Sequence, residues 1–359
     1  MRKVATLLLL ASLAALAPCQ ASWAHSQYAT DQIEKYRKHF DVPGISVAIA
    51  RKGQVIFAKG IGFADLERNV PVRESDFFRL ASVSKPITAT MIFELAEQGK
   101  VDIDAPVRQY LPELPAHHVY RVRDLLCHQS GVRHYGADGP LRNYPTQISA
   151  LARFAKDPLL FVPGEKFSYS THAFTVLGAL IEKVTKKPYR VYSAEHLRAW
   201  GIKDVQCETG ANRNRTKIYT TVQGKNKVAE RDDLSWKYAG GGYEATAIGM
   251  CNLGSAILSG KILKPETLAK MWTLQKPRTG DSTMGLGWTV SDDDPKDRAA
   301  IHGGSQLGSN SRWSLQIDRD TVVMVLSNRD DHKPWLITLF LEELAATAPG
   351  AKLPTIKLD

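Results

Sequence analysis

Cysteine is scarce in this sequence of 359 residues, which contains only four. Cys19 lies near the N-terminus, and the other three are Cys127, Cys207 and Cys251. Three cysteines cannot all pair with one another, and their spacing matches no metal-binding motif. A chain of this length buries a large core without cross-links, so one disulfide is compatible with the sequence and none is required.

Long apolar runs are also scarce. The main one, residues 4–16, follows Arg2 and Lys3 and is too short for a comfortable transmembrane helix. Small residues come next, up to a favourable cleavage point after Ala24. This order of basic, apolar and small residues is typical of a secretory signal peptide, which we expect over residues 1–24. The sequence therefore predicts a secreted or periplasmic protein.

Membrane attachment would require a lipid on Cys19. Residues 16–19 resemble a lipobox, but Pro18 directly before the cysteine fits that motif poorly. No other segment is long and apolar enough to span a bilayer. We therefore expect an exported, soluble protein that meets a membrane only if Cys19 is lipidated.

Acidic residues are outnumbered, with 37 Asp and Glu against 47 Lys and Arg, for a formal net charge of +10. Removal of residues 1–24 takes away Arg2 and Lys3 and lowers this charge to +8. A basic exported protein suits an anionic surface such as cell wall or lipid headgroups. Nucleic acid is not an expected partner, because the basic residues form no helical stripe and no zinc-finger spacing occurs.

Hydrophobic periodicity places strands near both ends of the chain and helices between them. Strands are expected at residues 45–51, 54–60 with a continuation through 61–72, 285–290, 299–302, 312–318 and 322–327. Helices are expected at residues 27–40, 102–111, 123–131, 148–156, 172–186 and 334–347. Two more helices are expected: one begins at the turn around Pro86 and ends at Gly99, and the other begins within residues 240–246 and ends at about residue 258.

This order of elements predicts an α/β (α+β) domain over residues 25–359. One antiparallel sheet is built from about residues 25–80 and 285–350 and is flanked by helices, and a mainly helical lobe is inserted at about residues 86–280. We expect a catalytic cleft between the sheet and the lobe.

The segment Ser82-Val-Ser-Lys85 stands at the start of the helix that ends at Gly99. A spacing of three places Ser82 and Lys85 on one face of the first turn, near the positive end of the helix dipole. A lysine amine there can take the serine proton, which would make Ser82 an activated nucleophile. The alternative is structural: Ser82 or Ser84 caps the helix and Lys85 points into water. Partners elsewhere in the chain decide between the two.

Tyr169, in a turn ahead of a helix, is a candidate for the base that a nucleophilic serine needs. A tyrosine takes the serine proton if a nearby cation, such as Lys85, lowers its pKa. The alternative is a half-buried aromatic side chain whose hydroxyl is hydrogen-bonded.

Residues 302–305, His-Gly-Gly-Ser, follow the end of a predicted strand. Gly303 and Gly304 let a substrate approach the backbone closely, and the N–H of Ser305 can then point at an oxyanion. His302 can donate a hydrogen bond or titrate near neutral pH. The alternative is an ordinary Gly-Gly turn beside an exposed histidine.

Together these segments resemble the three motifs of serine β-lactamases and penicillin-binding proteins, in the same order. The first is Ser82-Val-Ser-Lys85, the second is Tyr169-Ser-Thr171 and the third is His302-Gly-Gly304. Tyr in the second and His-x-Gly in the third are similar to the class C β-lactamase-like branch, which includes esterases, D-amino-acid peptidases and carboxypeptidases. Within that branch the likeness is greatest to the mitochondrial serine β-lactamase-like proteins and their bacterial relatives, and it covers roughly residues 30–347.

The resemblance implies a role for each matching residue. Ser82 would be the nucleophile, Lys85 its proton partner, and Tyr169 the general base for acylation and, with water, for deacylation. The backbone N–H groups of Ser82 and Ser305 would form the oxyanion hole beside the two glycines. His302 would hold Tyr169 or a carboxylate of the substrate.

Two positions depart from the family pattern. The second motif usually ends in Asn, whose amide contacts the acyl side of the substrate, whereas Thr171 offers a single hydroxyl. The third motif has His302 where antibiotic-hydrolysing enzymes carry Lys, so it lacks a permanent positive charge for a β-lactam carboxylate. Both departures favour a peptidase or an esterase over a strong β-lactamase.

We therefore expect an exported serine hydrolase that forms an acyl-enzyme on Ser82 and cleaves amide or peptide bonds, as a D-Ala-D-Ala carboxypeptidase or related peptidase. A carboxylesterase or a weak β-lactamase is the enzymatic alternative. A non-catalytic cell-wall or penicillin-binding module is the alternative of another class. The expected partner is a small-molecule or peptide substrate, including cell-wall peptide, and no metal or organic cofactor is expected.

Other histidines do not form a zinc site, because none has a helical two-histidine spacing with a carboxylate. They are His117, His118, His128, His134 and His172. His134 and Tyr135 either line the cleft or lie in a surface loop, and the surface loop is the favoured interpretation. The loops that we expect to select the substrate lie at about residues 133–146 and 213–236. Their sequences contain no motif that identifies the substrate.

Overall fold

The structure, a computed structural model, describes residues 23–136, 142–210, 212–291, 294, 297–348 and 350–358. Most of the expected signal peptide, including Cys19, lies outside these residues, as does part of the loop at 133–146. None of the helices in the described part of the chain has the length and apolar character needed to cross a membrane.

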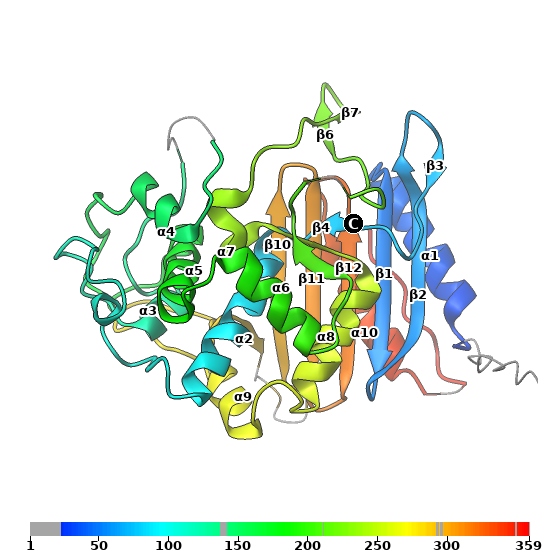
Figure 1. Ribbon diagram of the computed structural model, residues 1–359. Helices are drawn as coiled ribbons and strands as arrows, with labels where there is room; N and C mark the ends of the chain where they lie inside the picture. The colour runs from blue at the N-terminus through cyan, green and yellow to red at the C-terminus, as the bar shows by residue number, and fades with distance from the viewer. Residues whose placement is uncertain are drawn as a thin grey trace, which may run out of the picture.

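An antiparallel sheet of seven strands dominates the described residues, in the order β3-β2-β1-β12-β11-β10-β9 (Figure 1). Its strands are β1 (Gly44–Arg51), β2 (Gln54–Asp65), β3 (Val70–Pro71), β9 (Thr289–Ser291), β10 (Ala299–Gln306), β11 (Ser309–Gln316) and β12 (Thr321–Ser327). Strands β1 and β12 join the two ends of the chain, with Ile45 opposite Ser327 and Arg51 opposite Thr321. The predicted sheet built from both chain ends is confirmed.

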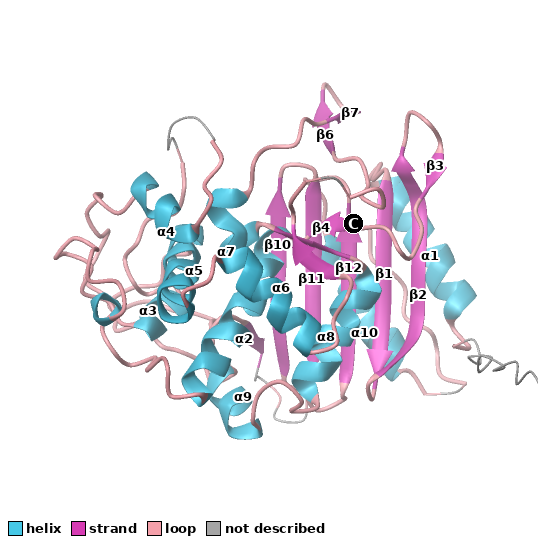
Figure 2. Cartoon of the chain, in the orientation of Figure 1, coloured by secondary structure: helices cyan, strands magenta, loops and turns pink. Residues whose placement is uncertain are grey.

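Helices cover both faces of this sheet (Figure 2). Helices α1 (Ser26–His39) and α10 (Pro334–Ala346) pack on one face, and α8 (Ala247–Leu258) packs on the other. Alternate residues of a strand point to opposite faces, so Val323 and Val325 of β12 join the cluster with α10 while Met324 joins the cluster with α8. The central strands are therefore apolar on both faces, which explains their continuous hydrophobic sequence.

The rest of the chain forms a lobe beside the sheet that is mainly helical (Figure 1). Its helices are α2 (Ser84–Glu97), α3 (Val122–Leu126), α4 (Gln147–Ala150), α5 (Thr171–Thr185), α6 (Tyr189–Ala199), α7 (Tyr238–Gly241) and α9 (Pro265–Met271). Short 3₁₀ helices cover Ala81–Val83, Val107–Gln109, Leu151–Arg153 and Ser235–Lys237, and short strands form β4 (Phe78–Arg79), β5 (Val205–Cys207), β6 (Tyr219–Val222), β7 (Lys225–Val228) and β8 (Tyr243–Ala245).

Several expected elements are shorter or shifted. The helix expected at 102–111 is only the 3₁₀ turn Val107–Gln109, since the Asp102 carboxylate binds the backbone N–H of Asp104 in place of a helical partner. The helix expected at 123–131 ends at Leu126, because His128 has a φ of 60°.

Other differences have similar local causes. The strand expected at 285–290 begins only at Thr289, because Gly287 has a φ of 87° and breaks the extended chain. The helix expected at 148–156 is one α-helical turn followed by a 3₁₀ turn. Helices α6 and α9 and the strands β5 and β8 were not predicted. Cys127, Cys207 and Cys251 are buried free thiols.

Candidate active site

Ser82 lies in a short connection between β4 and α2 that is held on both sides. The backbone N–H of Leu80 donates to Tyr243 O at 2.8 Å, and Ser311 Oγ of β11 donates to Leu80 O at 2.7 Å. Ala81 then adopts a φ of 48°, a left-handed conformation that costs energy for a residue with a side chain. These bonds fix the direction in which the chain enters the 3₁₀ turn, and therefore the position of Ser82.

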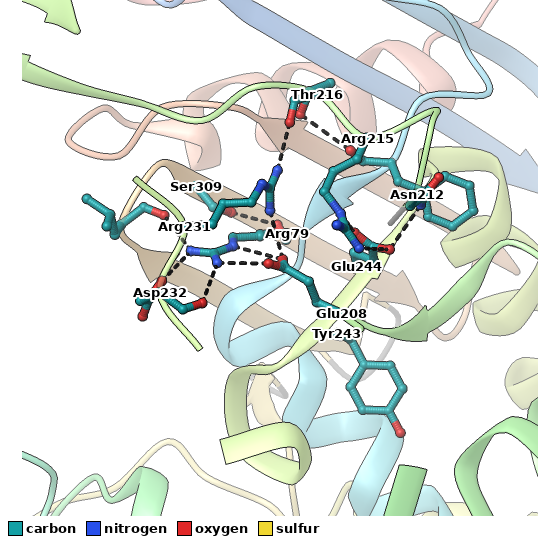
Figure 3. Close-up of polar contacts among 12 residues, drawn as sticks. Arg79, Glu208, Asn212, Arg215, Thr216, Arg231, Asp232, Tyr243, Glu244 and Ser309 are labelled. Carbon is teal, nitrogen blue, oxygen red and sulfur yellow. Dashed lines mark hydrogen bonds and ion pairs between the residues drawn. The ribbon is translucent and has the colours of Figure 1, made fainter. Parts of the chain in front are cut away.

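A buried ion cluster anchors β4 three residues before Ser82 (Figure 3). Arg79, whose side chain is 0% exposed, donates to both carboxylate oxygens of Glu208 at 2.8 Å and to Asp232 at 2.7 Å. Arg231 forms a further ion pair with Glu208 at 3.0 Å. Glu208, Arg231 and Asp232 also line a surface hollow of about 450 Å³. Since they are paired with one another, the cluster holds β4 in place rather than offering a free charge.

Lys85 is fully buried, and its amine has three close partners. Lys85 Nζ lies 2.6 Å from Gly240 O, 3.2 Å from Thr171 Oγ1 and 3.1 Å from Ser82 Oγ. Burial, followed by the charge of Lys237, holds the pKa of Lys85 well below its usual range. An uncharged amine has two N–H donors and one lone pair. If the N–H groups of such an amine are directed to Gly240 O and Thr171 Oγ1, its lone pair is left for the hydroxyl of Ser82.

Tyr169 lies on the other side of Ser82. Burial raises the pKa of Tyr169, and a hydrogen bond with Ser82 opposes this shift only partly. Its ring packs against His128, with 4.3 Å between ring centroids, and Lys85 Nζ lies 4.8 Å from its centroid. We expected a charged Lys85 to lower the pKa of Tyr169. The structure gives the opposite direction, because burial leaves both side chains uncharged.

Thr171 and His302 are more deeply buried than we expected. Thr171 begins α5 and is 3% exposed, and its hydroxyl contacts Lys85 rather than open solvent. His302 is 4% exposed, and its Nδ1 lies 2.7 Å from Gly303 O, so that nitrogen carries the proton and donates. Its ring centroid lies 6.4 Å from that of Tyr169. Burial lowers the pKa of His302 to about 3.

The backbone of β10 forms the opposite wall of a cleft of about 410 Å³ that opens over Ser82. Gly303, Gly304 and Ser305 line this cleft together with Ser82 and Tyr169. A Cβ on Gly304 would lie 2.4 Å from Leu80 O and 3.0 Å from Ser82 N. Glycine at this position therefore lets β10 lie directly against the Ser82 segment, and it brings Ser82 and Ser305 to the same cleft.

Sequence reasoning missed or misplaced several residues around the cleft. His134 and Tyr135 line it, so their assignment to a surface loop was wrong. Arg312, on β11, also lines it, and the buried Lys237 lies 5.2 Å from the ring centroid of Tyr135. Neither basic residue belongs to a motif, so only the fold reveals their position. No group of three or more potential metal ligands occurs among the described residues.

Comparisons with known proteins agree with this geometry. The Beta-lactamase family model matches residues 29–346. The human mitochondrial serine beta-lactamase-like protein LACTB is 26% identical over 347 residues, which cover 71% of this chain and 63% of that protein. Esterase EstB of Burkholderia gladioli is 28% identical over 333 residues, which cover 79% of this chain and 84% of that protein.

The fold is also found among solved structures. The octameric penicillin-binding protein homologue from Pyrococcus abyssi superposes with a TM-score of 0.79 at 22% identity, over 89% of this chain and 77% of that one.

This chain spans only 61% to 63% of the length of its mitochondrial relatives from human, mouse and cattle. The family match covers nearly the whole described chain, and the protein belongs to the Beta-lactamase family.

Proposed function

We propose that this protein is a serine hydrolase that works through an acyl-enzyme on Ser82. The observation that carries the proposal is the position of Ser82 Oγ, 3.1 Å from the buried amine of Lys85 and at the floor of an open cleft. A structural serine that caps a helix needs no such amine, and Ser82 makes no cap to α2. Membership of the Beta-lactamase family supports the same reading.

The contacts suggest an order of proton transfers. The lone pair of Lys85 takes the proton of Ser82 as Oγ attacks the substrate carbonyl carbon. The resulting oxyanion would be held by the backbone N–H groups of Ser82 and Ser305, two residues that line one cleft. Tyr169 keeps its phenolic proton and hands it to the leaving group, and Lys85 resupplies the proton to Tyr169. Water then attacks the acyl-enzyme with the same groups working in reverse.

The substrate class that we favour is an amide or peptide, as in a D-Ala-D-Ala carboxypeptidase or related peptidase. An amine leaves only when protonated, and a neutral Tyr169 beside Ser82 Oγ is a suitable donor. A carboxylesterase is the second candidate, favoured by the likeness to a bacterial esterase over most of both chains. Thr171, buried against Lys85, does not supply an amide for a β-lactam, so we expect at most weak β-lactamase activity.

Intact-mass spectrometry with a fluorophosphonate probe tests the nucleophile. We expect one adduct on the wild-type protein and none on Ser82→Ala. Ser84→Ala is the matched control: Ser84 Oγ donates to Ala81 O at 2.6 Å and accepts from the backbone N–H of Tyr243 at 3.2 Å, and since neither contact involves Lys85 or Tyr169, labelling should remain. An acyl-D-Ala-D-Ala peptide, an aryl ester and a penicillin then compare the bond types. If a folded wild-type protein forms no adduct, the proposal fails and a non-catalytic binding module replaces it.

We also propose that residues 1–24 direct export, so that the protein acts in the periplasm or outside the cell. The support is the order of basic, apolar and small residues at the N-terminus. The mass of the protein recovered from periplasm and medium tests this. A mature chain that starts near residue 25 agrees with it, and an intact N-terminus found only in the cytoplasm contradicts it.

A further inference from the structure

Tyr169 lies on a segment that no regular secondary structure holds in place. Ser82 belongs to a 3₁₀ turn and Lys85 to the first turn of α2, whereas residues 166–170 form neither a helix nor a strand. A phenol that exchanges a proton at the site must keep its hydroxyl within hydrogen-bond reach, and a displacement of about 1 Å can slow a reaction by roughly 10²-fold. Contacts from elsewhere in the chain must therefore fix this segment.

His128 contacts the segment at three places. Its carbonyl oxygen accepts the backbone N–H of Ser168 at 2.9 Å, and its ring Nδ1 accepts the backbone N–H of Ser170 at 3.1 Å. Between these two bonds the His128 ring packs on the ring of Tyr169, with 4.3 Å between centroids and 33° between planes. One residue thus holds the backbone on each side of Tyr169 and the aromatic ring itself.

The backbone of His128 adopts an uncommon conformation at this point. Helix α3 ends at Leu126, and a φ of 60° at His128 turns the chain out of the helix. A left-handed conformation costs energy for a residue with a side chain, and such conformations concentrate at functional sites. The side chain of His128 is 1% exposed, so it serves a contact inside the protein and not one with solvent.

The hydrogen bonds of the ring also indicate a specific task. Burial holds the pKa of His128 well below its usual range, so the ring is neutral. Because Nδ1 accepts a hydrogen bond, the proton of the neutral ring is on Nε2, which has no hydrogen-bond partner among the described residues. A buried N–H without a partner costs free energy that an aliphatic side chain would avoid. Packing alone therefore does not explain a histidine here, whereas the acceptor at Nδ1 does.

A second histidine holds the chain just beyond Tyr169. The backbone N–H of Thr171, at the start of α5, donates to His134 Nδ1 at 3.1 Å. The ring centroid of His134 is 5.8 Å from that of Tyr169, compared with 4.3 Å for His128. His134 thus fixes the start of the helix, and His128 is the residue that contacts Tyr169 itself.

We propose that His128 is a positioning residue that holds the hydroxyl of Tyr169 beside Ser82, so that Tyr169 can pass its proton to the leaving group. The inference rests on the proposed hydrolase function and adds to it a residue that decides which leaving groups depart. As the bond from the carbonyl carbon to the leaving atom breaks, the phenolic proton moves to that atom, and Lys85 returns the proton taken from Ser82. A basic leaving group needs this proton, whereas a weakly basic one departs without it.

Phenyl acetate and 4-nitrophenyl acetate separate the two cases, because 4-nitrophenolate is much the less basic leaving group. In His128→Gly we expect the ratio of kcat/KM values, phenyl over 4-nitrophenyl, to fall by about tenfold or more. The fall should be smaller in His128→Asn, since the Asn side-chain oxygen can still accept the N–H of Ser170. Glycine and asparagine both tolerate a φ near 60°, so both variants should fold.

Two controls separate positioning from general damage. In a Tyr169→Phe background, the addition of His128→Gly should leave the ratio unchanged, because no phenolic proton remains to be positioned. His118 is the matched control, as a buried histidine that bonds to Tyr120 and Ala155 and does not line the cleft. His118→Asn should keep the wild-type ratio even if it lowers stability.

Hydrogen exchange of the Ser170 amide tests the contact without turnover. Exchange should become faster in His128→Gly than in the wild-type protein, and less so in His128→Asn. A wild-type ratio in His128→Gly overturns the proposal, as does an equal fall of the ratio in the Tyr169→Phe background. If the wild-type protein hydrolyses neither ester and forms no fluorophosphonate adduct, the hydrolase proposal fails and the catalytic role of His128 fails with it. Amide exchange then decides only whether His128 holds Ser170.

Discussion

Lys85 Nζ and Ser82 Oγ are 3.1 Å apart, and the amine is buried completely. Most lysines carry a charge and cannot accept a proton, but here burial and the neighbouring Lys237 favour the uncharged form. In the proposed mechanism, the proton acceptor is therefore in place before any substrate arrives. This relationship makes the pH dependence of acylation informative.

We predict that the rate of Ser82 acylation reaches its plateau well below pH 10. Only uncharged Lys85 accepts the proton, and its pKa lies well below the value of 10.5 that is usual for lysine. The pKa of His302 is lowered to about 3, so His302 should add no step near pH 6.5. The rate of fluorophosphonate labelling across this range is the measurement. A rate that still rises near pH 10 would show a charged Lys85. Lys85→Met should slow labelling by roughly 10²- to 10⁴-fold.

Gly304→Ala should damage the site, and Gly303→Ala should not alter the fold. A Cβ at 304 would lie 2.4 Å from Leu80 O and 2.5 Å from Ser311 Oγ, so β10 must move away from Ser82. We expect a loss of about 1–3 kcal/mol in the free energy of unfolding and almost no labelling of Ser82.

At 303 the nearest atom is Arg312 Nη1 at 3.7 Å, which is ordinary contact. Urea denaturation of the two variants gives the comparison. Equal stability of both would mean that β10 does not lie against the Ser82 segment as described.

Arg79→Met should be strongly destabilising although Arg79 is far from a substrate. It leaves Glu208, 8% exposed, and Asp232, 24% exposed, without their main cation, which typically costs about 3–5 kcal/mol. Urea denaturation at neutral pH measures this. Arg319→Met, which breaks the half-exposed pair with Asp297, should change the free energy of unfolding by less than about 1 kcal/mol. Similar losses in both variants would argue against a buried cluster.

Lys237→Met should change how stability depends on pH. Burial lowers the pKa of Lys237 to about 8, whereas an unfolded lysine titrates near 10.5. Between these values the unfolded chain binds more protons, so the contribution of Lys237 to stability rises with pH and levels off above them. We expect the wild-type protein to gain roughly 3 kcal/mol relative to the variant between pH 7 and pH 11. If the free energy of unfolding depends on pH in the same way in both proteins, Lys237 is exposed to solvent in the folded protein and the prediction is wrong.

The sheet was predictable because its signals are local. The β1–β2 hairpin turns at Lys52 and Gly53, which have φ values of 50° and 76°, and β12 is apolar along its whole length. The lobe was less predictable, because its short helices depend on tertiary contacts. Residues 102–111, for example, have helical spacing but are held by a side-chain bond from Asp102 and a turn at Val107–Gln109.

The site also contains residues that the sequence predicts and residues that only the fold reveals. Ser82, Lys85 and Tyr169 belong to motifs, and the structure places them in contact, while their chemical roles stay predictions. Arg312 has no motif, and its place in the cleft depends on the pairing of β11 with β10. Such a relationship between two strands cannot be read from one linear sequence.

The pairing of β1 with β12 has a consequence for the biosynthesis of this protein. Ile45 and Ser327 are neighbours in the sheet, yet nearly the whole chain separates them, so the contact order is high. While the ribosome is still making the lobe, β1 and β2 form at most an isolated hairpin, which is marginally stable. The sheet closes only after β12 has emerged. Such late closure of the sheet fits the export proposed for this chain from residues 1–24.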